Sequence, residues 1–189
     1  MQKGTGVEFK SLLTQEEYER LTQMFKGNKL DTQTNHYFDT SRFSLKALDT
    51  SLRIREREDL ELTLKRKKGY SVNEVSVTVS QDQLAEIRET GIIPFPEIQN
   101  ELTTLIGDQK VNNFLSLSTH RLFLQYKNGI LFVDKSEYLG VTDYEIEYVA
   151  TSYHQGKKEF VEIINELNIH YKKADKKIKR AYNAYKKLH

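Results

Sequence analysis

The chain has 189 residues, of which 38% are hydrophobic and 30% are charged, and its formal net charge is +2. A charge so close to zero gives no global reason to bind nucleic acid or a membrane surface, so a strong anion site has to come from local clustering. The absence of cysteine excludes disulfides, thiolate metal sites and a cysteine nucleophile.

No apolar run approaches the roughly 18 residues that a membrane-spanning helix requires. The first residues lead directly into a charged strand and show no signal-peptide pattern. The length and the absence of an obvious linker predict a single domain over residues 1–189. Together these features predict a cytoplasmic protein that binds neither membrane nor nucleic acid; the oligomeric state stays open.

The first half of the chain alternates strands with short helices. Thr14 with Glu17 and Ser80 with Gln83 have the spacing of capping boxes, and Gly27 and Gly91 are suitable helix ends. The patterns predict helices over about 14–27 and 80–91 and a helical turn over 43–48. The predicted strands cover about 5–13, 32–40, 50–58, 61–67 and 73–79.

The second half begins with a predicted helix over 97–106, and three strands follow at about 115–126, 130–137 and 141–150. Asn128 and Gly129 lie between two apolar runs, which is a strong hairpin signal. Leu139 and Gly140 form the next turn. Two helices, over about 155–167 and 174–188, end the chain.

Eight strands that follow one another through short turns predict a mostly antiparallel sheet. Eight is also about the number at which a sheet closes into a barrel that holds one small ligand. The sequence therefore predicts an α+β fold, an eight-stranded closed β-barrel with helices that cover its outside. The charged strand faces would then line the interior.

Charged residues occupy alternate positions on several of these strands, so each strand has one apolar and one charged face. The signs are segregated, because two strands supply mainly bases and two supply acids. A solvated face or cross-strand ion pairs could explain any single residue. The set as a whole favours a site that holds a polyanion through its bases and a divalent cation through its acids: Glu8, Lys10, Arg53, Arg55, Lys65, Glu74, Arg121, Asp134, Glu145 and Glu147.

Each residue type suits this chemistry. Guanidinium groups bind phosphate oxygens in a bidentate manner, and lysine adds a point charge. Carboxylates are hard oxygen ligands for Mg²⁺ or Mn²⁺. In the basic C-terminal helix, Lys177 and Arg180 lie three residues apart on one face, where they could point toward such a site. The residues alone therefore predict metal-assisted chemistry on a short polyphosphate.

The chain resembles the CYTH superfamily, the triphosphate tunnel metalloenzymes, over nearly its whole length. The resemblance rests on an ordered set of segments, which together are specific. These are Gly6-Val7-Glu8-Phe9-Lys10, Asn35-His36-Tyr37-Phe38-Asp39-Thr40, Leu52-Arg53-Ile54-Arg55, Leu62-Thr63-Leu64-Lys65, Glu74, Thr119-His120-Arg121, Asp134, Tyr138-Leu139-Gly140, Asp143-Tyr144-Glu145-Ile146-Glu147 and Lys177-Ile178-Lys179-Arg180.

The resemblance implies a tunnel that binds triphosphate-containing small molecules together with Mg²⁺ or Mn²⁺. It implies phosphate contacts from Lys10, Arg53, Arg55, Lys65, Arg121, Lys177 and Arg180. It implies metal ligands at Glu8, Glu74, Asp134, Glu145 and Glu147, with Lys10, Glu74 and Glu147 as catalytic residues. One position departs from the family pattern, because Gly6 stands where the first glutamate of the amino-terminal signature is expected.

Our leading hypothesis is a metal-dependent hydrolase of inorganic tripolyphosphate or a related triphosphate. The alternative enzyme is a class IV-type adenylate cyclase, in which a substrate hydroxyl attacks in place of water. The third hypothesis is a non-catalytic polyphosphate- or nucleotide-binding module, which the loss of a carboxylate at Gly6 makes credible.

Overall fold

The computed structural model describes residues 6–69 and 71–189. The predicted start of the first strand at Thr5 lies outside the described residues. The chain forms two compact units: unit 1 consists of residues 1–32 and 118–189, and unit 2 of residues 33–117. We describe each unit separately.

Unit 1 contains three whole strands and three helices. Its elements are β1 (Val7–Leu13), α1 (Gln15–Met24), β7 (Gly129–Tyr138), β8 (Val141–Ala150), α5 (Tyr153–Glu166) and α6 (Lys177–Leu188). Unit 2 contains α2 (Ser44–Ala47), β3 (Thr50–Glu56), β4 (Leu60–Lys68), β5 (Ser71–Val79), α3 (Gln81–Thr90) and α4 (Pro96–Ile106). Two long strands, β2 (Lys29–Asp39) and β6 (Asn112–Tyr126), contribute residues to both units.

The eight strands belong to one sheet in the order β1-β8-β7-β6-β2-β3-β4-β5. The pairs β1–β8, β7–β8, β6–β7, β2–β3, β3–β4 and β4–β5 are antiparallel. The predicted eight antiparallel strands with helices are therefore confirmed. Closure into a barrel is not confirmed, because β1 and β5 are the two ends of this order and no hydrogen-bonded pair joins them among the described residues. Strand periodicity cannot predict closure, which depends on long-range pairing.

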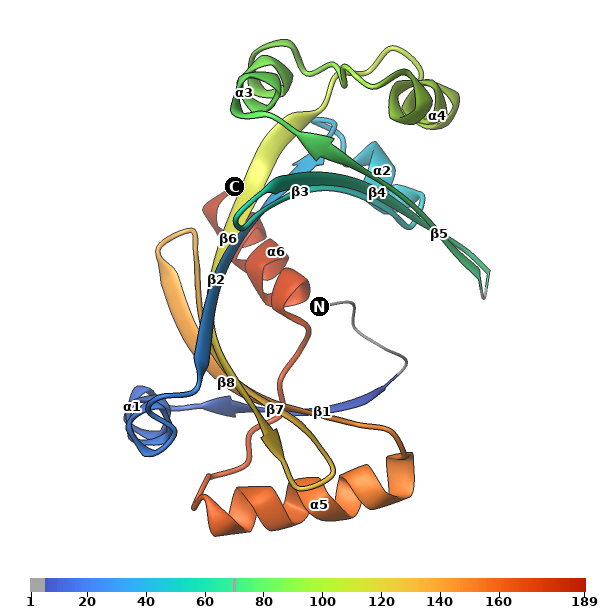
Figure 1. The fold of residues 1–189 in the computed structure, drawn as a ribbon. Coiled ribbons are helices and arrows are strands. Elements are labelled where there is room, and N and C mark those ends of the chain that lie inside the picture. Colours follow the sequence, from blue (N-terminus) through green and yellow to red (C-terminus); the bar gives the residue numbers. More distant parts are fainter. Residues whose placement is uncertain (1–5, 70) are drawn as a thin grey trace. The chain divides into compact units, whose positions relative to one another are not determined.

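The core of unit 1 lies between one face of the sheet and helices α1 and α5 (Figure 1). Alternate residues of the strands, among them Val133, Ile146 and Tyr148, pack against Phe160 and Ile163 of α5. Because the side chains of a strand alternate between its two faces, the intervening residues of β7 and β8 point away from these helices. Those residues include Asp134, Glu145 and Glu147.

Unit 2 repeats this division of faces. Helices α3 and α4 lie on one side of β3, β4 and β5 (Figure 1). Leu52, Ile54, Leu62 and Leu64 are buried on that side. The alternate residues of the same strands, which carry the bases predicted for phosphate binding, lie on the opposite face. In unit 2 the helices thus cover one sheet face and leave the other to the charges, as predicted. In unit 1, by contrast, helix α6 contacts the charged face.

The hairpin between β6 and β7 forms as predicted, but Gly129 is needed for strand packing and not for the turn. Tyr126 pairs with Gly129, so Lys127 and Asn128 make the two-residue turn, and Lys127 has a positive φ of 51°. Gly129 is already part of β7. A Cβ atom there would lie 2.4 Å from the Val149 carbonyl oxygen and 2.7 Å from the Tyr148 ring. Close packing against β8 therefore requires the glycine, a constraint that the local sequence does not reveal.

Among the described residues, no helix is long and apolar enough to cross a membrane.

Asp39 holds the link between β2 and α2. It is buried, and its Oδ1 accepts hydrogen bonds from the backbone N–H groups of Thr40 and Leu45, at 2.7 and 3.0 Å. Its Oδ2 accepts one from the N–H of Lys46 at 3.0 Å. The residue that precedes α2, Phe43, makes no side-chain capping bond and has a φ of 57°. Asp39 thus satisfies helix N–H groups that would otherwise lack acceptors.

We expect Asp39→Ala to lower the free energy of unfolding by about 1–3 kcal/mol, since buried N–H donors lose a charged acceptor. Asp39→Asn should have a smaller effect, because the amide keeps one acceptor oxygen. Urea titration followed by circular dichroism measures both, with the exposed Asp108→Ala as a control. Equal stability of Asp39→Ala and the control would show that the cap does not stabilise unit 2.

Candidate functional site

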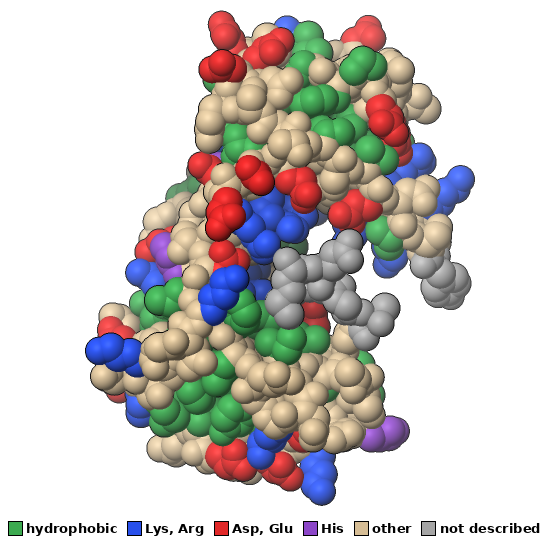
Figure 2. Space-filling view, viewed as in Figure 1, with side chains coloured by type: hydrophobic (Ala, Val, Ile, Leu, Met, Phe, Trp, Pro, Cys, Tyr) green, Lys and Arg blue, Asp and Glu red, His purple; other side chains and the backbone are tan. Residues whose placement is uncertain are grey.

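Charged side chains of both signs gather on part of the surface. Figure 2 shows an area in which Lys and Arg side chains lie together, bordered by Asp and Glu side chains. In unit 1, acids and bases share the sheet face that points away from α1 and α5. In unit 2, bases dominate the face that points away from α3 and α4.

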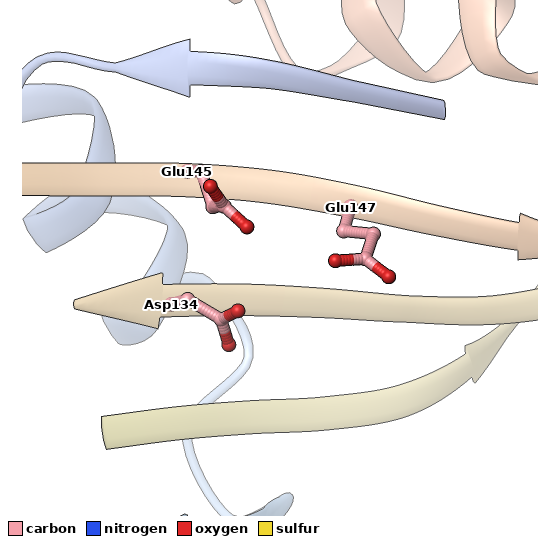
Figure 3. Close-up of side chains that lie close together, drawn as sticks. All are labelled: Asp134, Glu145 and Glu147. Atoms are coloured by element: carbon pink, nitrogen blue, oxygen red, sulfur yellow. The ribbon is translucent and has the colours of Figure 1, made fainter. Parts of the chain in front are cut away.

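Three carboxylates form the centre of the unit 1 site. Asp134 extends from β7, while Glu145 and Glu147 extend from the neighbouring β8 (Figure 3). One oxygen from each carboxylate lies within 4.8 Å of the others. All three residues are buried, with 0–2% of each exposed. Among the described residues this is the one group of three or more His, Asp or Glu side chains with metal-binding spacing.

Strand register brings these residues together. Asp134 pairs with Arg121 of β6 on one side and with Glu145 of β8 on the other. Glu147 pairs with Lys10 of β1. Since directly opposed residues of antiparallel strands have Cβ atoms about 4.5–5.5 Å apart, two neighbouring rows of the sheet supply the whole cluster.

Arg121 makes a bidentate ion pair with Asp134. Its Nε and Nη2 donate to the two oxygens of Asp134 at 2.8 and 2.7 Å, and Nη2 lies 3.7 Å from Glu147. The guanidinium also stacks over the Phe132 ring, at 4.2 Å from its centre. Burial by itself would raise the pKa of Asp134, but the hydrogen bond from Arg121 and the charge of Lys177 outweigh it and lower the pKa. Asp134 therefore stays ionised at neutral pH.

Helix α6 brings two more bases to the charged face. Lys177 donates to Asp134 at 2.5 Å and to Glu145 at 2.6 Å. One turn later, Arg180 donates from Nη2 to Glu145 at 2.6 Å and binds Asp143 through both Nε and Nη2. Burial lowers and the facing carboxylates raise the pKa of Lys177, and the net shift is upward. Lys177 and Arg180 thus bind the same carboxylate, that of Glu145.

Asp143 and Tyr138 complete the cluster, and no site role was predicted for either. Asp143 accepts two hydrogen bonds from Arg180 and one from the Tyr138 hydroxyl at 2.5 Å. Burial and this hydrogen bond raise the pKa of Tyr138 to about 12, so it remains a donor. Asp143 precedes Glu145 by two residues, so strand alternation was a usable signal for its place on the charged face. Its partner Arg180 is 37 residues away.

Lys10 and Glu8 lie at the β1 side of the cluster. The Lys10 ammonium is 4.0 Å from Glu147 and 3.8 Å from Glu8. The Glu8 side chain is 35% exposed, so it is more open to water than the three buried carboxylates. Gly6 is exposed and lies just before the first residue of β1.

The three carboxylates suit a hard divalent cation. Their oxygens are the ligands that Mg²⁺ and Mn²⁺ prefer, and neither sulfur nor imidazole is part of the group. A three-oxygen set leaves coordination positions for water and for phosphate oxygens, which Mg²⁺ usually retains. The donor set therefore fits the predicted metals.

The charged face of unit 2 is built mainly from bases. In the register, Tyr37 pairs with Arg53, Asn35 with Arg55, and Lys65 with Glu74. The Nε atoms of Arg53 and Arg55 are buried and have no hydrogen-bond acceptor among the described residues. Burial and the nearby charges of Arg53 and Arg57 lower the pKa of Arg55. Such an arrangement of like charges favours a bound anion.

The predicted metal ligands are divided between the units. Asp134, Glu145 and Glu147 form the buried group of unit 1, and Glu8 lies on the same sheet face beside Lys10. Glu74 is exposed and belongs to unit 2, where Lys65 faces it in the sheet. Of the predicted phosphate ligands, Lys10, Arg121, Lys177 and Arg180 contact carboxylates of unit 1. Arg53, Arg55 and Lys65 share the charged face of unit 2.

Comparison with known proteins places the whole chain in one group. A protein 31% identical over 99% of both chains is named "Putative triphosphatase YjbK", from Bacillus subtilis (strain 168). A crystal structure named as a "putative adenylate cyclase" from Bacillus halodurans has a TM-score of 0.72 at 33% identity, covering 95% of this chain and 98% of its own.

A Hippeastrum adenylyl cyclase homologue, whose description reports a dominant triphosphatase activity for that protein, has a TM-score of 0.68 at 20% identity. The match covers 95% of this chain and 96% of that one, and it supports the fold alone. The model of the CYTH domain matches residues 5–182. With this match over nearly its whole length, the chain belongs to the CYTH domain family.

Proposed function

We propose that this protein is a metal-dependent hydrolase of inorganic tripolyphosphate or another small triphosphate. The observation that carries the proposal is the buried group of Asp134, Glu145 and Glu147, held among bases on the sheet face that points away from α1 and α5. Polyphosphate hydrolysis needs a cation to neutralise phosphate charge and bases to fix the substrate, and this face has ligands for both. The name of the Bacillus subtilis relative supports the same reaction.

The proposal includes the finer expectations that the sequence raised. The two units act as one CYTH domain over residues 1–189, with the sheet closed as a tunnel, in the cytoplasm. The partner is a triphosphate-containing small molecule, with no role for nucleic acid or membrane. Mg²⁺ or Mn²⁺ is the cofactor, held by Asp134, Glu145 and Glu147, with Glu8 and Glu74 as further ligands.

The residues divide the work as follows. Arg53, Arg55 and Lys65 of unit 2 and Lys10, Arg121, Lys177 and Arg180 of unit 1 bind phosphate oxygens, Arg180 after it releases carboxylate bonds. Glu147 or Glu74 orients the attacking water and accepts its proton, while Lys10 stabilises the charge that develops on the phosphate. The water oxygen bonds to the terminal phosphorus, the bridging P–O bond breaks, and pyrophosphate leaves. A bound divalent cation would supply charge neutralisation and a more acidic water.

A nucleotidyl cyclase is the second candidate, because the Bacillus halodurans relative carries that name at 33% identity. The same phosphate and metal ligands would serve, with a ribose hydroxyl as the attacking group. A binding module without turnover is the third. Assays of phosphate release from tripolyphosphate, ATP and thiamine triphosphate, together with cyclic AMP formation, separate the three.

We expect phosphate release from tripolyphosphate with Mg²⁺ or Mn²⁺ and none with chelator. Glu147→Gln should lower kcat by about 100-fold or more, since it removes a base and a metal ligand. Glu137→Gln is the matched control, because this glutamate of β7 is 43% exposed and pairs with His120 and Lys135. Cyclic AMP from ATP without phosphate release, or binding without either product, would replace the hydrolase proposal.

We expect Arg53→Ala or Arg55→Ala to weaken tripolyphosphate binding by about 10-fold or more, because each removes a charged donor worth roughly 1.5–3 kcal/mol. Stability should change little, since each substitution also relieves repulsion between like charges. Isothermal titration and urea unfolding measure the two effects, and Arg42→Ala, at an exposed position, is the control. Loss of folding with retained affinity would make these arginines structural.

Gly6→Glu should raise both metal affinity and the rate of phosphate release. The new carboxylate would lie two residues before Glu8, on the same side of the extended chain, and add charge and a ligand to the β1 side of the cluster. Gly6→Gln, which adds a similar side chain without charge, should leave both unchanged. If Gly6→Glu has an unchanged Mg²⁺ dependence, the missing glutamate does not limit this site.

A further inference from the structure

Lys177 lies where a cation bound by two of the three carboxylates would lie. Its Nζ is 2.5 Å from Asp134 Oδ2 and 2.6 Å from Glu145 Oε1, while these two side chains are 0–1% exposed. Since Asp134 and Glu145 both belong to the group with metal-binding spacing, the ammonium and a metal ion compete for the same carboxylates. A metal ion cannot use both oxygens while Lys177 holds them.

The net charge of the cluster also indicates that Lys177 and a divalent cation compete. Among residues 6–69 and 71–189, its ion pairs join five carboxylates, Glu8, Asp134, Asp143, Glu145 and Glu147, to four bases, Lys10, Arg121, Lys177 and Arg180. These nine residues carry a formal charge of −1. A divalent cation added to them would produce +1 in a buried place, which is unfavourable. Without Lys177, the other eight carry −2, which one divalent cation neutralises.

The Lys177 side chain can also move without displacing the helix that carries it. It is the first residue of α6, and Lys176 before it makes no side-chain capping bond. Arg180 holds the helix through Asp143, Glu145 and the Asp175 carbonyl, so α6 has an anchor that does not depend on Lys177. The flexible lysine side chain can therefore turn from the carboxylates to an anion without displacement of the helix.

We propose that Lys177 occupies the cation position of the ligand-free protein and makes metal binding depend on the substrate. Metal alone binds weakly, because it must displace the ammonium. A triphosphate that binds beside the cluster offers the ammonium a new anionic partner, so that metal and triphosphate each strengthen the binding of the other. The coupling between metal and triphosphate rests on the function proposed above, whereas the competition between Lys177 and metal does not.

The first experiment measures Mn²⁺ binding to the full-length protein by calorimetry, with no phosphate present. We expect Lys177→Gln to bind Mn²⁺ at least about 10-fold more tightly than the wild type, although a positively charged phosphate ligand is lost. Lys179→Gln is the matched control: it removes the same charge two residues away, where the lysine is 62% exposed and pairs with Asp175. It should match the wild type.

Unchanged or weaker Mn²⁺ binding by Lys177→Gln, in a protein whose circular dichroism matches the wild type, would overturn the inference. If Lys177→Gln does not fold, Lys177→Met keeps the length of the apolar stem and provides the same test. Because this titration contains no triphosphate, it can succeed when the hydrolase proposal fails. Equally, wild-type protein that hydrolyses tripolyphosphate while both variants bind Mn²⁺ as the wild type does would refute this inference alone.

The second experiment measures the coupling directly, with a non-hydrolysable imido analogue of tripolyphosphate. Wild-type protein should bind this analogue more tightly with Mn²⁺ than with chelator. In Lys177→Gln the factor by which Mn²⁺ tightens binding should be smaller, because the metal no longer has an ammonium to displace. An equal factor in both proteins would show that Lys177 does not link the two ligands.

Discussion

The burial of several carboxylates on one sheet face is the constraint on which the rest of unit 1 depends. Asp134, Glu145 and Glu147 are close enough to repel one another and are almost inaccessible to water. Charged groups in such a place need compensation, or they take up protons. Here the compensation comes from β6, β1 and α6, three elements far apart in sequence, so the architecture and the charge state of the cluster stabilise each other.

The helices make this arrangement possible by covering the other face. In both units the apolar residues of the strands face helices, and the alternate residues are left for charged side chains. An antiparallel sheet usually packs one face and solvates the other. In unit 1 the face without α1 and α5 receives α6 instead, a helix that begins with bases and binds the acids.

The two units differ in how their buried charges are compensated. Unit 1 nearly balances its acids with bases, so it is ready for a cation only when a base leaves. In unit 2, the buried Nε atoms of Arg53 and Arg55 have no acceptor in the described part of the chain, and burial with nearby like charges lowers the pKa of Arg55. The buried acids of unit 1 are suitable ligands for a metal, and the buried arginine nitrogens of unit 2 are suitable donors for an anion.

Local sequence patterns were enough to predict the eight strands and the capping boxes that begin α1 and α3. These features depend on neighbours in sequence: Thr14 and Glu17 form their capping box within one turn, and Glu145 and Glu147 share a face because strands have a period of two. Long-range contacts determine the features that sequence patterns could not predict. Gly129 is required by the approach of β8, and Asp39 by the N–H groups of α2. Lys177 binds carboxylates that are 43 and 32 residues away in sequence. The helical period predicts only which helix face a base occupies, whereas its partners depend on the tertiary structure.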